Sequence, residues 1–260
     1  MSDDAAAVQW VAGRCLLCGA ERRFECAPAS DGSLRESLRC EACGCIARQR
    51  AVAGLLLDGL DRDARVYLTE QASVLYVALR RHLRRLQGSE WVASPLRRLR
   101  LAAWLWRHGV AEWIRREDVT ALRFADASLD ALATLDVLEH VPDYAAALHE
   151  FARVLRPGGR LVLCAPYFPE LPGIETRATV DAEGRVTHLL PPEYHGDPLG
   201  GGVVCFHHFG TGLLDALGEA GFEQVRPVAV EDPAAGLPQP VLVICAVRSR
   251  NRLPPAPPGK

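Results

Sequence analysis

Residues 118–168 read DVTALRFADASLDALATLDVLEHVPDYAAALHEFARVLRPGGRLVLCAPYF, and this stretch decides the fold class. An apolar run at 129–135 has the length of a buried strand, and apolar residues at helical spacing follow over 144–155. A second apolar run, 160–167, follows the Pro-Gly-Gly segment. A strand, a helix and a strand in this order predict two parallel strands joined by a crossover helix.

The same alternation extends on both sides of that stretch. Upstream we expect helices at 48–60, 73–85 and 96–108, strands at 65–68 and ending at 88–91, and an extended piece at 112–119. Downstream, a helix and two strands precede a Pro-rich tail at 251–260, which we expect to be disordered. The predicted class is α/β, with a Rossmann-like, mostly parallel sheet covered by helices on both faces over 51–250.

Three motifs of the opening stretch resemble the class I S-adenosylmethionine-dependent methyltransferases, in particular their ubiquinone-biosynthesis-like (type 11) group. These motifs are Asp118 before a turn, TLDVLEHV at 134–141 and RVLRPGGRLVL at 153–163. The resemblance implies S-adenosylmethionine as cofactor and methyl transfer as activity. It is more specific for the fold than for the activity, because one fold supports many functions.

Acidic residues stand at successive strand ends, where open α/β sheets bind their ligands. They are Glu70, Glu90, Asp118 and Asp136. One strand-helix-strand unit separates Glu90 from the first strand, which suits a carboxylate that holds the ribose hydroxyls. The resemblance places Asp118 and Val119 near the adenine, and 136–140 along the cofactor and the substrate entrance. The alternative is that these acids are solvated charges or helix caps.

The first strand of such folds usually ends in a glycine-rich turn, but here it is followed by TEQAS at 69–73. Glycines there let the backbone approach the ligand closely. In their absence, Thr69 and Gln71 are expected to hydrogen-bond the cofactor while Glu70 binds its ammonium group, and Ser73 is expected to cap the next helix. Otherwise the pocket has lost its cofactor and the protein is a non-catalytic binding or scaffold protein.

Two CxxCG motifs near the start predict a structural zinc site. Their cysteines, Cys15, Cys18, Cys40 and Cys43, have the pattern of a four-cysteine zinc ribbon, which we assign to 1–50. The alternative is a set of reduced structural thiols. Cys26 and Cys45 are left over, and either could replace a ligand or be buried.

A long insertion at about 170–205 supplies candidates for proton transfer. DAEG lies between two alternating runs and predicts a β-hairpin, and a Pro- and Gly-rich loop follows. His195 in this loop is the preferred general base, and His140, Glu139 and His207 are weaker candidates. Alternatively, these histidines are packed or solvated. Two histidines and a carboxylate could also bind a divalent metal, but no sequence spacing supports that site.

The overall composition favours a small or sugar-like acceptor with an oxygen or nitrogen nucleophile. The formal net charge is −2, which does not favour a general nucleic-acid-binding protein. Arg-rich segments at 80–86 and 95–108, together with the zinc ribbon, keep an RNA methyltransferase open. Neither a signal peptide nor a stretch long enough to span a membrane is visible, so we expect a cytoplasmic protein.

Overall fold

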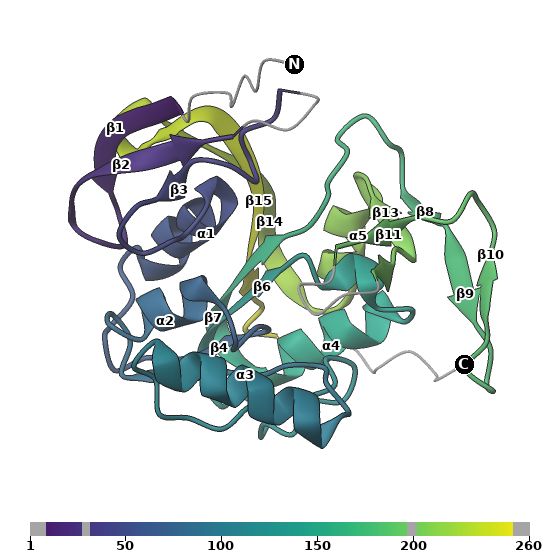
Figure 1. Cartoon of the computed structure of the whole chain (residues 1–260). Helices are drawn as coiled ribbons and strands as arrows, with labels where there is room; N and C mark the ends of the chain where they lie inside the picture. Colours follow the sequence, from purple (N-terminus) through teal and green to yellow (C-terminus); the bar gives the residue numbers. More distant parts are fainter. Residues whose placement is uncertain (1–8, 28–31, 197–201, 252–260) are drawn as a thin grey trace, which may run out of the picture.

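The computed structural model describes residues 9–27, 32–196 and 202–251, and the predicted disordered tail lies, except for Asn251, outside this range. Its centre is a six-stranded sheet with the strand order β14-β15-β7-β6-β4-β5 (Figure 1). The strands are β4 (Arg65–Leu68), β5 (Arg85–Gly88), β6 (Leu129–Leu135), β7 (Leu155–Cys164), β14 (Phe222–Asp232) and β15 (Leu237–Arg248).

Four neighbouring strands of this sheet run parallel. Val66 of β4 lies opposite Leu86 of β5 on one side and Ala131 of β6 on the other, and β6 pairs in parallel with β7. Only β14 and β15 run antiparallel to their neighbours. The carboxyl ends of the parallel strands therefore meet at one edge, and we call the residues that follow β4, β5, β6 and β7 the sheet rim. The predicted fold class is confirmed.

Helices cover both faces of the sheet because successive strand residues point to opposite sides. Val66 and Leu68 pack in the same cluster as residues of three helices, whereas Tyr67 packs with residues of the other two. The first group is α1 (Ala47–Leu57), α2 (Val74–Leu79) and α3 (Pro95–Arg107), and the second is α4 (Tyr144–Val154) and α5 (Gly212–Glu219).

One predicted helix is much shorter than expected. The pattern predicted 73–85, but α2 ends at Leu79 after six residues. The chain must leave the helix early because Arg85 already pairs with Arg65 in the sheet. Ser73 caps α2 as predicted, since its side chain accepts a hydrogen bond from the Tyr76 amide. The extended piece at 112–119 contributes only an isolated bridge, between Arg116 and Glu90.

The N-terminal segment folds into a three-stranded antiparallel sheet that lies on the main domain. Its strands are β1 (Gln9–Cys15), β2 (Ala20–Cys26) and β3 (Arg39–Cys40). Its buried residues, among them Phe24 and Leu38, share one hydrophobic core with α1, α2 and the sheet. In Figure 1 it sits beside the far end of the β14–β15 hairpin.

The insertion between β7 and α5 is built of short strand pairs. They comprise β8 (Ile174–Thr176), β9 (Ala178–Val180), β10 (Val186–His188), β11 (Tyr194–His195), β12 (Val203–Val204) and β13 (His207–Phe209), while two 3-10 turns elsewhere are η1 (Leu138–His140) and η2 (Pro233–Ala235). The β9–β10 pair confirms the predicted hairpin. Within the described ranges, every helix is too short or too polar to cross a bilayer.

Candidate functional site

The four predicted cysteines converge in the N-terminal module. Their sulfur atoms all lie within 4.8 Å of one another, with Cys15 and Cys43 at 3.8 Å and Cys18 and Cys40 at 3.9 Å. Ligands at a Zn–S distance of about 2.3 Å on a tetrahedron are about 3.8 Å apart, so the four thiols fit Zn²⁺. Cys45 is buried outside this four-cysteine cluster, and Cys26 is partly buried.

A buried arginine ties this module to the end of the chain. Arg50, which is 1% exposed, donates to the carbonyls of Leu38, Ala235 and Gly236 at 2.6–2.9 Å. Its guanidinium also lies 3.9 Å from the centre of the Phe24 ring. Hydrogen bonds from a charged donor stabilise more than neutral ones. The contacts join η2 and the β14–β15 hairpin to the four-cysteine cluster.

The glycine-free turn at 69–73 is held by its own side chains. Thr69 donates to the Thr134 hydroxyl, and Ser73 donates to the carboxylate of Glu70. Gln71 is 1% exposed, and its amide bonds Trp113 and Arg115 backbone atoms and the Glu112 carboxylate. The turn is therefore fixed to the 112–115 segment.

Glu90 supports the same turn from the next strand. One of its carboxylate oxygens accepts the amides of Gln71 at 2.9 Å and Ala72 at 2.7 Å. A carboxylate here does what backbone geometry does in a glycine-rich turn, since it fixes the path of the chain. The predicted ribose contact of Glu90 and the predicted cofactor contacts of Thr69 and Gln71 stay predictions. In the structure the side chains of these three residues bond protein atoms.

Carboxylates do gather at the rim. Burial raises the pKa of Glu70 to about 7, with the charges of Glu90 and Asp136 acting in the same direction. Asp136 adopts a positive φ of 45° and forms ion pairs with Arg35 at 2.7 Å and Arg48 at 2.6 Å. Acids therefore stand at three neighbouring strand ends, which fits a cofactor that carries an ammonium group and ribose hydroxyls.

Two residues after Asp136, the η1 turn brings Glu139 and His140 to the insertion. Glu139 is fully buried, and neither of its carboxylate oxygens has a hydrogen-bond partner in the part of the chain that the structure describes. Burial, followed by the charge of Asp136, raises its pKa to about 8. His140 Nε2 and His195 Nδ1 each lie 3.9 Å from the same Glu139 oxygen. We call these three residues the Glu-His cluster.

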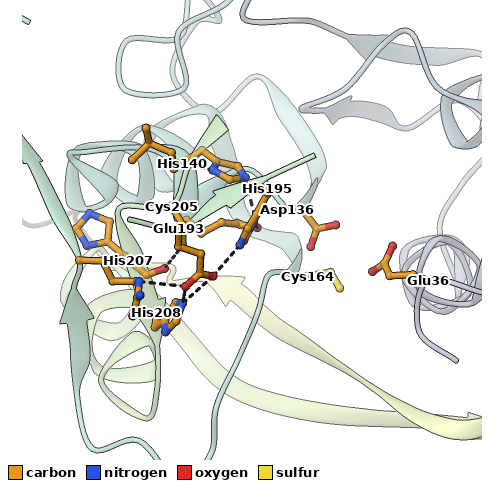
Figure 2. A network of polar contacts seen from close by, with 12 residues as sticks. Glu36, Asp136, His140, Cys164, Glu193, His195, Cys205, His207 and His208 are labelled. Atoms are coloured by element: carbon orange, nitrogen blue, oxygen red, sulfur yellow. Dashed lines mark hydrogen bonds and ion pairs between the residues drawn. The ribbon is translucent and has the colours of Figure 1, made fainter. Parts of the chain in front are cut away.

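Both histidines of the cluster are oriented through their second nitrogen. His140 Nδ1 lies 2.7 Å from the Val204 carbonyl, and His195 Nε2 lies 3.1 Å from a Glu193 carboxylate oxygen. Glu193 is held in turn by Arg177 at 3.2 Å and His208 at 3.0 Å. Figure 2 shows this network between the insertion and Asp136, with Glu36 beyond Asp136. The free nitrogens of His140 and His195 therefore face Glu139.

The remaining predicted residues lie in more ordinary surroundings. Asp118 accepts hydrogen bonds from Thr120, at 2.9 Å from the amide and 2.6 Å from the hydroxyl, and lines a cavity of about 1150 Å³. Val119 packs against the core. His207 packs edge-on against Tyr144, bonds the Pro142 carbonyl, and has its pKa lowered by burial. His207 is therefore packed in the protein, which is one of the alternatives to a role in proton transfer.

Several functional candidates were missed in the sequence. Arg35 and Arg48 come from the N-terminal module and α1, yet they bind Asp136 of the rim. Nothing in the spacing of 32–38 indicates such a contact. Glu193 was visible only as one polar residue of the loop, and its role depends on Arg177, His195 and His208, which lie apart in the sequence.

Comparison with known proteins finds relatives of the central segment of the chain. Residues 75–163 match a family model described as a methyltransferase domain. A demethylmenaquinone methyltransferase of Mycobacterium sp. (strain KMS) is 55% identical over 47 residues, which are 18% of this chain and 20% of that protein. The chain thus matches about a fifth of the length of such relatives.

Solved structures share the fold at low identity. An S-adenosylmethionine-dependent methyltransferase from Mesorhizobium loti is 22% identical, with a TM-score of 0.52, 80% of this chain covered and 100% of that one. The [4+2]-cyclase SpnF is 16% identical, with a TM-score of 0.52 and coverages of 77% and 81%. The central segment of the chain thus matches a methyltransferase domain, and the chain has the fold of S-adenosylmethionine-dependent methyltransferases.

Proposed function

We propose that the protein transfers a methyl group from S-adenosylmethionine to an oxygen or nitrogen nucleophile of a small or sugar-like acceptor. The observation that carries this proposal is the Glu-His cluster, which lies beside Asp136 at the end of β6 and is closed by the insertion. A polar, partly buried cluster next to the cofactor edge of this fold suits the acceptor end of a transfer reaction.

When bound, S-adenosylmethionine supplies an electrophilic methyl group. The side chains of the rim then have separate tasks. Glu70 and Asp136 provide carboxylates for the ammonium end, and Glu90 keeps the 69–73 turn in place. Arg35 and Arg48 offset the negative charge that these acids accumulate.

His195 is the proposed proton acceptor. Glu193 accepts the Nε2 proton of His195, so that in this tautomer the lone pair of Nδ1 points toward the cluster. As the electron pair of the acceptor attacks the methyl carbon, Nδ1 takes the proton of the attacking hydroxyl or amine. Alignment of the nucleophile supplies a further part of the rate.

Two measurements test the proposal. Isothermal titration of the full chain with S-adenosylmethionine and S-adenosylhomocysteine should show one site per chain, whereas no heat with either would support the non-catalytic alternative.

Turnover is measured as the amount of S-adenosylhomocysteine formed with a panel of phenols, amino sugars and nucleotide sugars. His195→Ala should lower kcat by roughly a hundredfold, and Glu193→Gln by less. His149→Ala on α4 is the matched control, and equal loss in it would reject the base role.

An RNA acceptor has one specific observation in its favour. Trp91 and Trp113, 66% and 65% exposed, line the cavity of about 1150 Å³ together with Arg98, Arg115, Arg116 and Arg123. Exposed indole rings among arginines suit stacking of unpaired bases. An affinity for single-stranded RNA that falls steeply with salt, and is lost in Trp91→Ala, would favour this candidate.

A further inference from the structure

The Glu-His cluster has the features of a metal site that is only partly assembled. Its three ligand atoms lie within 4.8 Å of one another, although they come from residues 139–140 and 195. The 3.9 Å separations from Glu139 to each histidine are too long for hydrogen bonds. An ion with bonds of about 2.1 Å holds neighbouring ligands about 3.0–3.4 Å apart, so a small inward movement would close the site.

The surroundings of Glu139 are the strongest indication that the Glu-His cluster binds a cation. A fully buried carboxylate without a hydrogen-bond partner is costly, and buried charges in proteins are normally paired or coordinate metals. The two arginines whose charges act on it, Arg35 and Arg48, are already joined to Asp136. A cation between Glu139 and the two histidines would give this carboxylate its partner.

The histidines carry the second sign. Histidines that bind metals almost always donate their other ring nitrogen to a carbonyl or a carboxylate, which orients the ring and its lone pair. His140 meets this condition through the Val204 carbonyl, and His195 through Glu193. The neighbouring group of Glu193, Cys205 and His208 differs in its carboxylate, which already bonds Arg177 and two histidines.

We propose that Glu139, His140 and His195 bind one divalent first-row transition metal, of the Mn²⁺, Fe²⁺, Co²⁺ or Zn²⁺ class. Two imidazoles and one carboxylate favour these ions over Mg²⁺ and Ca²⁺, which take oxygen ligands. Three protein ligands leave positions for an acceptor oxygen.

The chemical role of this metal rests on the proposed methyl transfer, but metal binding does not. A metal held by Glu139, His140 and His195 would lower the pKa of an acceptor hydroxyl, whose proton would pass to solvent water. The electron pair of that oxygen would then form the new bond to the methyl carbon, while the electron pair of the broken carbon–sulfur bond would stay on sulfur. When the metal is bound, His195 is one of its ligands and cannot also accept the proton, so the role of ligand replaces the role of proton acceptor.

The experiment uses the full, untagged protein with zinc retained in the four-cysteine cluster. After weakly bound ions are removed with EDTA, Mn²⁺ is titrated and the free ion is followed by electron paramagnetic resonance. We expect about one Mn²⁺ per chain, with affinity lowered by roughly tenfold to a hundredfold in Glu193→Gln and by more in Glu139→Gln and His195→Ala. Co²⁺ should show visible bands without the strong absorption of thiolate ligands.

His149→Ala is the matched histidine control and should bind Mn²⁺ as the unchanged protein does. Zinc content and circular dichroism show whether each variant is folded. The proposal is overturned if folded protein binds none of Mn²⁺, Co²⁺ and Zn²⁺ beyond the cysteine-bound zinc, or if Glu139→Gln binds them equally well.

Activity separates the two proposals. Methyl transfer that survives EDTA without loss rejects the catalytic role of the metal and leaves the proposed function standing. Metal binding without any binding of S-adenosylmethionine or S-adenosylhomocysteine rejects the proposed function and leaves the metal site standing.

Discussion

The four-cysteine cluster and the Glu-His cluster are both groups of potential metal ligands, but they are built differently. The cysteines come in two CxxC turns that place each pair of thiols by local geometry. Glu139 and His140 come from the η1 turn after β6, whereas His195 comes from the insertion. The first cluster is joined to the rest of the fold by Arg50, and the second lies at the sheet rim.

The number and kind of ligands indicate a different role for each cluster. Four thiols complete a tetrahedron and leave no position for a substrate, so the cysteine cluster is suited to hold a structure together. The Glu-His cluster offers three ligands, and one of them is a buried carboxylate that the fold keeps at a cost. Costly polar groups of this kind are typical of functional sites.

We expect the largest effect from the loss of two cysteines of the four-cysteine cluster. Cys40→Ser with Cys43→Ser should abolish zinc binding and cost more than about 4 kcal/mol of the free energy of unfolding, because the module shares its core with the sheet. Elemental analysis and thermal unfolding measure this. Cys245→Ser, outside the cluster, should change little. A double variant as stable as the unchanged protein would contradict a structural metal.

Arg50 tests how the module is attached. Arg50→Ala leaves three buried carbonyls without their donor and should cost about 3 kcal/mol, measured by urea unfolding. Arg39→Ala, an exposed residue of the same module, serves as control and should cost less than about 0.5 kcal/mol. Equal costs for the two variants would mean that the buried contacts do not hold the module.

Glu139 should behave in the opposite way. Without added metal, Glu139→Gln should raise the free energy of unfolding by about 2 kcal/mol, because the amide removes a buried carboxylate that lacks a partner. Adding Mn²⁺ should stabilise the unchanged protein and not the variant. A variant that is destabilised in metal-free buffer would show that Glu139 has a structural role, and would contradict the view that the fold keeps this carboxylate at a cost.

The smallest effect concerns Glu70 and depends on pH. Its pKa rises from 4.5 to about 7 on folding, so the folded state binds the proton more tightly than the unfolded state. The contribution of Glu70 to stability should therefore fall as the pH rises from about 4.5 to 7 and stay lower above that. Glu70→Gln should match the unchanged protein near pH 4 and exceed it by about 1–2 kcal/mol at pH 8, since partial exposure reduces the full effect.

Chemical denaturation across this pH range measures the difference. Glu183→Gln in the exposed β9–β10 hairpin is the control and should show the same difference at both ends of the range. If Glu70→Gln gives a constant difference too, the pKa of Glu70 does not rise on folding.

Much of the fold could be predicted because apolar periodicity reflects burial directly. The strands at 65–68 and 129–135 were predicted to the residue, since each is a compact apolar run with a turn beyond it. The helix at 73–85 was overestimated because periodicity does not register where the next strand must start to pair.

The site was less accessible to sequence reasoning. The acids at the strand ends were found, because strand ends follow from the strands. Their partners were not, since Arg35 and Arg48 reach the rim from segments whose spacing contains no signal.

The alternation of strands and helices, the CxxC pairs and the acidic strand ends depend on neighbours along the chain, so they could be predicted from the sequence. The support of the glycine-free turn by Glu90, and the meeting of Glu139, His140 and His195, became visible in the folded chain. The physical reason is that these contacts join segments far apart in the chain, and their geometry exists only once the sheet and the insertion have packed.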